Sequence, residues 1–400
     1  MQTNLAKRFR EHAEAAHIDA ILRKCVHCGF CNATCPTYQL LGDELDGPRG
    51  RIYQIKQFLE GEPANAEMLK HLDRCLTCRS CETTCPSGVK YSHLLEFGKT
   101  AIERELPRAG WDRWRRGAIV RFIHSGWPFG FALRLGQFFK PLLPGPLGRA
   151  VPRRQKLVAR SGGSHQRKVL MLAGCVQPVL TPNTNRLAIN LLDRCGIEVI
   201  ESRDGLCCGA AAMHTSNPEL ALEQARRLID AWWPHIEAGA EAIVVSATGC
   251  GVNVADFGRL LAADSEYAGK AARVSELFRD LVDIVEAEID SLEPGAGAGR
   301  RVAVHTPCTM QHGLGLGGRV ERLLEQRGYQ ICTVAEGHLC CGSAGTYSML
   351  QPALAKRLRR NKLAALTGDS PQIIATANIG CQVHLTDPSE PPVVHWIELV

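Results

Sequence analysis

The sequence predicts an α+β protein of several domains, with a helical N-terminal part and a C-terminal part built from two α/β repeats. A cysteine run of the form C-x2-C-x2-C-x3-C-P occurs twice before residue 90, and helical periodicity separates the two copies. From residue 168 onward buried strands alternate with helices, and the same plan recurs 133 residues later. At 400 residues the chain is also too long for one ordinary hydrophobic core.

The composition excludes several classes of protein. The 18 cysteines are unusual for a chain of this length, although 45% hydrophobic and 22% charged residues are normal for a soluble protein. The first residues lack the apolar segment of a secretory signal, so we expect a cytoplasmic protein whose reduced thiols bind metal. No apolar run approaches about 18 residues, which predicts that no transmembrane helix is present.

The first cysteine run, at residues 25–36, follows an expected helix over residues 1–24. Three cysteines spaced by three can surround one iron–sulfur cube, and the fourth, followed by proline, leaves the loop in a new direction. The same frame returns at residues 75–86. This is the ligand pattern of a bacterial two-cluster ferredoxin, in which the fourth cysteine of each run crosses to the other cluster.

This pattern assigns eight cysteines to two [4Fe–4S] clusters. The first cluster is expected on Cys25, Cys28, Cys31 and Cys85, and the second on Cys75, Cys78, Cys81 and Cys35. The alternatives are zinc and disulfides. Structural zinc sites generally use paired C-x2-C units, so duplicated triplets with one further cysteine favour iron–sulfur clusters.

Helices rather than hairpins are expected between the two runs. Residues 52–59 carry apolar side chains at spacings of three and four, and a second short helix is predicted from Asn65 to Leu72. This arrangement resembles the α-helical ferredoxins in the iron–sulfur subunits of succinate- and fumarate-oxidoreductase-like complexes. We therefore expect an α-helical ferredoxin domain with two clusters over residues 1–105.

The segment 106–165 is basic and aromatic, and we expect it to connect two domains. It contains twelve Lys or Arg residues and a single acid, Asp112, whereas the whole chain has a net charge of only +6. Three interpretations remain open: a surface that lies on anionic lipid, a docking surface for a partner subunit, and a connector whose aromatic side chains pack on the protein's own core. No nucleic-acid fold motif accompanies the segment, so no nucleic-acid partner is expected.

Two α/β repeats are expected over residues 166–292 and 300–400, joined by a glycine-rich linker at residues 293–299. Buried strands are predicted at residues 169–175, 198–200 and 242–250 of the first repeat, with helices at 183–194 and 218–237, and strands at 301–308, 329–334 and 373–381 of the second. Strands that alternate with helices predict parallel sheets.

Each repeat carries four cysteines near the carboxyl ends of its strands. Open α/β sheets bind ligands at this edge, so we expect each set to converge on a metal. The additional candidate ligands are Cys175, Cys207, Cys208, Cys250, Cys308, Cys340, Cys341 and Cys381. Either a further iron–sulfur centre or zinc suits such thiols. Cys195 and Cys332 fall outside this frame and are expected to be buried thiols that act as small apolar residues.

The repeats resemble the cysteine-rich CCG domain of heterodisulfide reductases. That resemblance implies a cysteine, a CCG motif and a final C-x2-C, but Asn253 and His384 stand where the last cysteine would be. A metal site is therefore implied, but not the non-cubane cluster that needs the full set, and disulfide reduction is disfavoured. Other histidines of the second repeat, His305 among them, are each expected to be structural, and His384 is the strongest candidate ligand because of its position.

Together the two parts resemble the iron–sulfur subunits of glycolate oxidases, also called glycolate dehydrogenases. The resemblance covers nearly the whole chain and depends, beyond the general motifs, on residues 25–31, 37–52, 230–234, 339–347 and 376–382. It implies an electron-transfer subunit of a hetero-oligomer in which FAD-containing subunits oxidise glycolate to glyoxylate. It also implies that electrons leave toward a membrane acceptor such as quinone, from a protein peripheral to the inner face of the cell membrane.

The chain itself has no nucleotide-binding fingerprint and no paired-carboxylate or Ser-His-Asp arrangement. We therefore expect no catalytic residue here, and FAD only on partner subunits. The resemblance leaves open an iron–sulfur subunit of a D-lactate or glycerol-3-phosphate dehydrogenase. Two alternatives of other classes are a CCG-type thiol–disulfide reductase and a docking scaffold in which zinc staples the repeats.

Overall fold

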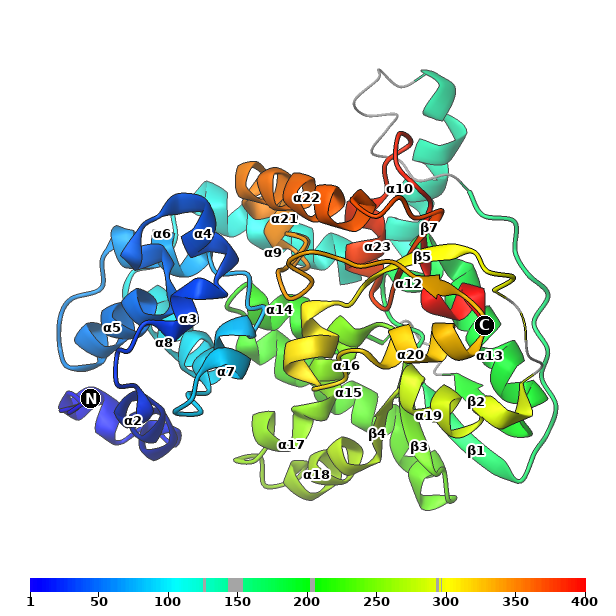
Figure 1. Ribbon diagram of the computed structural model, residues 1–400. Helices are drawn as coiled ribbons and strands as arrows, with labels where there is room; N and C mark the ends of the chain where they lie inside the picture. Colours follow the sequence, from blue (N-terminus) through cyan, green and yellow to red (C-terminus); the bar gives the residue numbers. More distant parts are fainter. Residues whose placement is uncertain (125–126, 143–153, 202–205, 293–294, 296) are drawn as a thin grey trace.

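The computed structural model describes residues 1–124, 127–142, 154–201, 206–292, 295 and 297–400. Figure 1 shows a helical N-terminal region, drawn in blue, beside two repeats that each contain a small parallel sheet. This confirms the predicted fold class, a helical ferredoxin-type part followed by two α/β repeats.

Short helices build the N-terminal region, and two of them confirm the predictions between the cysteine runs. α5 buries the apolar face of residues 52–59, and the Asn65 side chain accepts a hydrogen bond from the backbone N–H of Met68 (2.9 Å) to begin α6. The elements are α1 (Lys7–Arg10), α2 (Ala15–Lys24), α3 (Phe30–Ala33), α4 (Pro36–Leu41), η1 (Glu44–Asp46), α5 (Pro48–Leu59), α6 (Ala66–Asp73), α7 (Ser80–Thr84) and α8 (Tyr91–Glu105).

The prediction of one helix over residues 1–24 is wrong, because α1 ends at Arg10 and α2 begins at Ala15. The break lets both helices bury their apolar side chains. Phe9 of α1 packs on Phe58 with 5.1 Å between ring centroids, and Ile18 of α2 is fully buried in the same core. A straight helix of that length could not direct both stripes toward one core.

The basic aromatic segment forms α9 (Gly110–His124), α10 (Trp127–Phe138) and η2 (Lys140–Leu142). Trp111 and Trp114 stack on each other, 4.9 Å between centroids, yet 71% and 61% of their surfaces are exposed. Phe138 is 77% exposed. For these residues the interpretation that the aromatics pack on the protein's own core is therefore wrong. Residues 143–153 of this segment lie outside the described residues.

None of the described helices combines the length and the apolar character needed to cross a membrane. One side of α9 packs on the first repeat, where Val120 lies in a buried cluster with Ala212 and Ala221. α9 is thus anchored to the repeats while its tryptophans face outward.

The two sheets have the same strand order, which confirms the internal repeat. The first runs β2-β1-β3-β4 and the second β6-β5-β7-β8, and every pair is parallel. The strands are β1 (Arg167–Met171), β2 (Ile197–Glu201), β3 (Ala242–Val245), β4 (Phe278–Asp280), β5 (Arg301–His305), β6 (Gln330–Ile331), β7 (Ile373–Thr376) and β8 (Val393–His395). The strands predicted at residues 169–175, 242–250, 301–308, 329–334 and 373–381 all end earlier than expected, and Cys250 and Cys381 lie in the helices that follow β3 and β7. The edge strands β4 and β8 had no prediction.

Helices cover both faces of each sheet and include the predicted α13 and α15. The helices of the repeats are α12 (Gln177–Leu180), α13 (Pro182–Arg194), α14 (Ala210–His214), α15 (Pro218–Glu237), α16 (Thr248–Ala255), α17 (Phe257–Leu260), α18 (Ala268–Leu277), α19 (Leu281–Ala287), η3 (Ile289–Ser291), η4 (Thr309–Gly313, a π-helical turn), α20 (Arg319–Gln326), α21 (Tyr347–Leu350), α22 (Pro352–Thr367), α23 (Ile379–Leu385) and η5 (Trp396–Leu399). The linker predicted at residues 293–299 falls partly outside the described residues.

The two repeats share one hydrophobic core. Val169 of β1 and Val302 of β5 belong to the same buried cluster, so one face of each sheet is turned toward the other repeat. The carboxyl ends of the central strands also meet: the Thr248 N–H donates to the Ala377 carbonyl at 3.2 Å, and the hydroxyls of Thr248 and Thr309 are 2.7 Å apart. The two cysteine-bearing edges are therefore neighbours.

Candidate metal centres

The four thiols predicted for the first cluster line one cavity in the helical region. Cys25, Cys28 and Cys31 come from the first run, and Cys85 joins them from the second, as the crossed pattern predicts. Burial raises the pKa of Cys31 to about 11. A cation at this site would reverse that shift, because a metal stabilises the thiolate.

A second cavity holds the other predicted set. Cys75, Cys78 and Cys81 of the second run line it together with Cys35 of the first. Cys81 also lines the first cavity, so the two cavities are adjacent. Burial raises the pKa of both Cys78 and Cys81 well above the ordinary value for a thiol.

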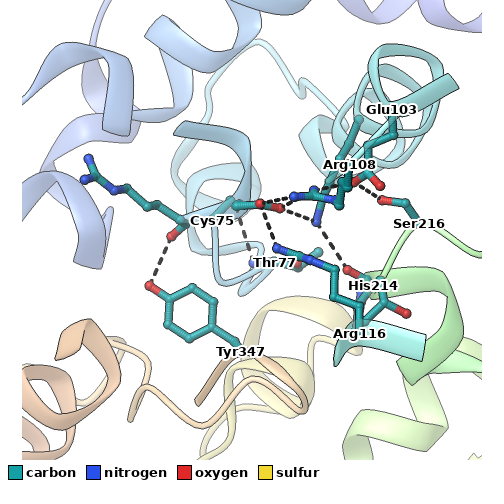
Figure 2. A network of polar contacts seen from close by, with 12 residues as sticks. Cys75, Thr77, Glu103, Arg108, Arg116, His214, Ser216 and Tyr347 are labelled. Carbon is teal, nitrogen blue, oxygen red and sulfur yellow. Dashed lines mark hydrogen bonds and ion pairs between the residues drawn. The ribbon is translucent and has the colours of Figure 1, made fainter. Parts of the chain in front are cut away.

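Both cysteine runs have the same backbone conformation. His27 and Thr77 occupy equivalent positions and have φ values of 57° and 55°, in the left-handed region. This turns backbone N–H groups toward sulfur: the Thr77 N–H donates to Cys75 Sγ at 3.4 Å (Figure 2), and the His27 backbone makes the equivalent bond to Cys25. Such inward N–H groups stabilise negative charge on thiolates and on cluster sulfur.

A buried charge network lies beneath the second cavity. Arg51 is 1% exposed, lines this cavity, and donates to the His71 carbonyl at 2.8 Å and to Thr37 Oγ1 at 3.1 Å. Its partner Asp46 is fully buried and also accepts from Arg74 at 2.6 Å. Burial opposes the charge of Arg51, but nearby Cys75 and the other anionic groups raise the pKa of Arg51 above its ordinary value. Arg51 is thus a fixed positive charge beside the second thiol set.

The four thiols of the first repeat also converge. Cys175 hydrogen-bonds to Cys207, and Cys208 hydrogen-bonds to Cys207 and Cys250. These contacts, together with burial, raise the pKa of Cys175 and Cys208 well above the ordinary value. The set therefore joins residues from two loops and from the first turn of α16 at the carboxyl edge of the sheet.

The second repeat repeats this arrangement. Cys308 Sγ lies 3.9 Å from Cys340 Sγ, and Cys341 hydrogen-bonds to both Cys340 and Cys381. Hydrogen bonding to Cys340, then burial, raises the pKa of Cys308 well above its usual range. Crowded, buried thiols of this kind are held more readily as metal thiolates than as free thiols.

The glycine of each CCG motif is required by space as well as by conformation. Gly209 has φ 89°, and a Cβ there would lie 2.7 Å from the Ala221 carbonyl oxygen. Gly342 has φ 91°, and a Cβ would lie 2.9 Å from the Ala355 carbonyl oxygen. The N–H groups of Gly209 and Gly342 donate at 3.4 Å to Cys207 and Cys340, respectively. The glycine therefore lets the cysteine pair approach the helix behind it.

The second helical cavity lies against the second repeat. Cys78 and Cys340 belong to one buried cluster with Leu76 and Tyr347, and the Tyr347 hydroxyl donates to the Arg74 carbonyl at 3.2 Å. Figure 2 shows Tyr347 reaching toward the Cys75 loop. The thiol set of the second repeat is therefore the neighbour of the Cys75–Cys78–Cys81 set.

The first repeat is fastened to the helical region by polar contacts. Figure 2 shows Ser216 beside Glu103, and its hydroxyl donates to that carboxylate at 2.7 Å. Farther along this interface Arg79 pairs with Asp256 at 3.1 Å, where both side chains are largely buried. These contacts hold the helical region against the first repeat, as the Tyr347 contact holds it against the second.

Sequence reasoning missed three buried polar residues at these sites, namely Arg51, His305 and Lys362. His305 lies with Cys341 and Cys381, whereas His384, the histidine favoured by its position, is outside that group. Cys332 is buried and Cys195 is partly buried at the end of α13, both apart from the two thiol sets. Arg51 and Lys362 each occur among the apolar positions of a helix. A charged residue in such a pattern could have indicated a buried charge.

The residues present suit soft metals. All four sets are built from cysteine sulfur, and every member except the exposed Cys28 is buried or half-buried. Backbone N–H groups point at several of the sulfurs. Thiolate sets of this kind select iron–sulfur clusters or zinc over magnesium or calcium.

Two family models match the chain. A 4Fe-4S dicluster domain covers residues 21–89, which contain both cysteine runs. A cysteine-rich domain matches twice, at residues 169–255 and 302–386, which contain the two thiol sets of the repeats. These matches agree with iron–sulfur binding by the helical region and with the internal repeat.

The chain is similar to two glycolate oxidase iron-sulfur subunits over most of its length. The chain is 49% identical to the glycolate oxidase iron-sulfur subunit of Escherichia coli (strain K12), over 100% of this chain and 98% of the relative. It is 27% identical to a probable glycolate oxidase iron-sulfur subunit of Bacillus subtilis (strain 168), over 91% of this chain and 88% of the relative. A lactate utilization protein A of Bacillus velezensis is 24% identical but matches only 54% of this chain.

Proposed function

Because the chain belongs to the family of glycolate oxidase iron–sulfur subunits, we propose that it is the electron-transfer subunit of a glycolate dehydrogenase. In this proposal FAD-containing partner subunits oxidise glycolate to glyoxylate, and this subunit conducts the electrons toward a membrane acceptor such as quinone. The observation that carries it is the pair of adjacent cavities in the helical region, each lined by all four cysteines of one crossed set.

The proposed ligands are those of the crossed pattern. Cys25, Cys28, Cys31 and Cys85 would hold one [4Fe–4S] cluster, and Cys75, Cys78, Cys81 and Cys35 the other. Such clusters supply one-electron redox states when bound, which suits transfer between a two-electron flavin reaction and a quinone. The eight cysteines of the repeats would hold further metal, and the proposed division is 1–105, 106–165, 166–292 and 300–400.

Residues of this chain would hold the clusters in place and adjust their reduction potentials along the proposed electron-transfer route. The N–H groups of the two cysteine loops stabilise sulfur charge, and Arg51 places a fixed positive charge beside the second set. Cys78 lies in the same buried cluster as Cys340. This contact favours the metal site of the second repeat as the next electron acceptor after the second cluster. The buried Tyr347 and Leu76 exclude water from that contact.

We also propose peripheral attachment to the inner face of the cell membrane through α9 and α10. Their exposed tryptophans and phenylalanines are interleaved with Arg and Lys, a composition suited to an anionic lipid surface. This would place the chain in the cytoplasm, next to a membrane acceptor.

The direct test is glycolate-dependent cluster reduction in the complex. The chain is co-produced with its flavoprotein partners, glycolate is added without oxygen, and cluster signals are followed by EPR. Glycolate should reduce the clusters, and replacing Cys78 by Ser should stop dye reduction while flavin reduction continues. If D-lactate reduced the clusters and glycolate did not, the assignment of glycolate as the substrate would be wrong, and the D-lactate dehydrogenase alternative would be favoured.

A further inference from the structure

His305 is a buried imidazole without an evident structural role. It is the last residue of β5 and is 2% exposed. Among the residues that the structure describes, neither of its ring nitrogens has a hydrogen-bond partner. Burying such polar atoms without partners destabilises a protein, so their position calls for a ligand.

The imidazole is aimed at two of the thiols of the second repeat. One ring nitrogen of His305 and the sulfurs of Cys341 and Cys381 all lie within 4.8 Å of one another. A tetrahedral zinc-like ion with bonds of about 2.0–2.3 Å holds its ligand atoms roughly 3.3–3.8 Å apart, on the order of 1 Å closer than this upper limit. The three atoms therefore need to move only slightly to share one ion.

The first repeat offers no such imidazole. Met171 pairs with Val244 in the first sheet as Val304 pairs with Ala375 in the second, so Leu172 and His305 occupy the same position. Leu172 is buried in an apolar cluster. Identical thiol sets thus have different surroundings in the two repeats.

A second difference supports this asymmetry. Ala221 and Ala355 pack on the CCG glycines of their repeats and are therefore equivalent. Leu228 and Lys362 each follow these alanines by seven residues, so they are equivalent as well. Leu228 is fully buried among apolar side chains. Lys362 is also buried, and its ammonium donates to the carbonyls of Glu336 and Gly337 at 2.8 and 3.2 Å. It is held beside the four thiols of the second repeat, where it offsets thiolate charge.

We propose that His305 is a metal ligand, together with Cys341 and Cys381, so that the second repeat holds a mixed thiolate–imidazole centre for a thiophilic metal. The proposal rests on metal binding by the repeats and adds the ligand that distinguishes the second from the first. Zinc and the iron of an iron–sulfur centre both accept such a nitrogen and sulfur set. In the iron case, an imidazole in place of a thiolate removes negative charge and raises the reduction potential.

The burial of His305 suits this role. The imidazole is enclosed by the protein, and its ring nitrogens have no hydrogen-bond partner among the described residues, so a ring lone pair can be offered to a metal. His384, one turn beyond Cys381 on α23, is a half-buried histidine outside the group and serves as the matched control.

The test uses the full chain, purified without oxygen, with the variants His305→Leu, His305→Cys and His384→Leu. Iron, zinc and acid-labile sulfide are measured first. Nitrogen coordination is then measured by pulsed EPR for an iron centre or by zinc-edge X-ray absorption for zinc. The wild type and His384→Leu should hold metal beyond the two cubane clusters, with one imidazole nitrogen bound. His305→Leu should lose that nitrogen signal and the additional metal, and His305→Cys should regain metal with sulfur-only coordination.

Two results would overturn the proposal: an unchanged nitrogen signal in His305→Leu, or no metal in the wild type beyond that of the cubane clusters. The proposed function has separate readouts, namely the cubane iron and sulfide and the reduction of the clusters by glycolate, and neither depends on His305. If His305→Leu does not fold, the coordination spectrum of the wild type and of His305→Cys still decides, since both predict a specific ligand set.

Discussion

Arg51 is the residue whose chemistry depends most on its surroundings. Its guanidinium is buried beside the thiols of Cys75 and Cys35 and is fixed by Thr37, Asp46 and the His71 carbonyl. A buried cation stabilises the more negative, reduced form of a neighbouring cluster. Arg51 should therefore set the potential of the second cluster rather than of the first.

Replacing Arg51 by Met should lower the reduction potential of the cluster at Cys75, Cys78 and Cys81 by on the order of 50–100 mV, the effect of one charge in a medium of intermediate dielectric constant. The measurement is a potentiometric titration followed by EPR. Arg51→Lys keeps the charge and should stay near the wild type. If the wild type, Arg51→Met and Arg51→Lys had equal reduction potentials, Arg51 would not set the potential of this cluster.

The crossed ligand sets make a residue-by-residue prediction. Cys35→Ser should damage the same cluster as Cys78→Ser, and Cys85→Ser the same cluster as Cys28→Ser, because each fourth cysteine serves the other run. Each variant should lose the EPR signal of one cluster and keep that of the other. If Cys35→Ser instead lost the same EPR signal as Cys28→Ser, the ligand sets of the two clusters would not be crossed.

At the scale of elements, the tight approach of each CCG loop to the helix behind it determines stability. Gly209→Ala should strain a left-handed residue and press its Cβ against the Ala221 carbonyl on α15, a combined cost of roughly 2–4 kcal/mol. Gly239→Ala is the control, because its φ is 94° but nothing lies within 4 Å of its Cβ. Thermal unfolding should show a clearly larger loss for Gly209→Ala, and equal losses would mean that the contact relaxes freely.

The α9–α10 surface predicts binding to anionic membranes. Trp111 and Trp114 are stacked and exposed, so replacing both by Ser should leave the fold intact and reduce sedimentation with vesicles that contain phosphatidylglycerol. Vesicles of phosphatidylcholine alone provide the baseline, and Tyr53→Ser on the exposed side of α5 is a matched control. Unchanged vesicle binding would assign this surface to a protein partner instead.

Elements with strong periodicity were predictable from the sequence. The apolar face of α5, the cap of α6 at Asn65, the helix α15 and the parallel order of the central strands all follow from local patterns. Helix α1 and the edge strands β4 and β8 are three or four residues long, too short for a period to appear. The single helix expected over residues 1–24 failed because tertiary burial of Phe9 overrides local propensity.

At the scale of the whole molecule, the sequence predicted which cysteines belong to each set but not how the sets lie relative to each other. The spacing of the runs predicts four cysteines per cavity, and the structure gathers each set around one cavity. The proximity of Cys78 to Cys340, and of His305 to Cys341 and Cys381, joins residues far apart in the chain. Such contacts depend on docking between domains, which no local pattern encodes.

The arrangement gives the proposed electron route a direction. The first cavity is near the outer side of the helical region, the second lies against the second repeat, and the carboxyl edges of the two repeats adjoin. Ion pairs such as Arg79–Asp256 and Arg259–Glu96, both at 3.1 Å, hold these parts together. The route would therefore be interrupted by loss of either the second cluster or the second repeat.

The central claim is that the helical region holds two [4Fe–4S] clusters for electron transfer, and one measurement tests it most directly. Iron and acid-labile sulfide are quantified in the full chain purified without oxygen, and EPR spectra are recorded after reduction. The account predicts about eight irons and eight sulfides per chain from the two cubane clusters, before any metal of the repeats is counted, with two interacting reduced clusters in the spectrum. Zinc without sulfide, or a single cluster, would contradict it.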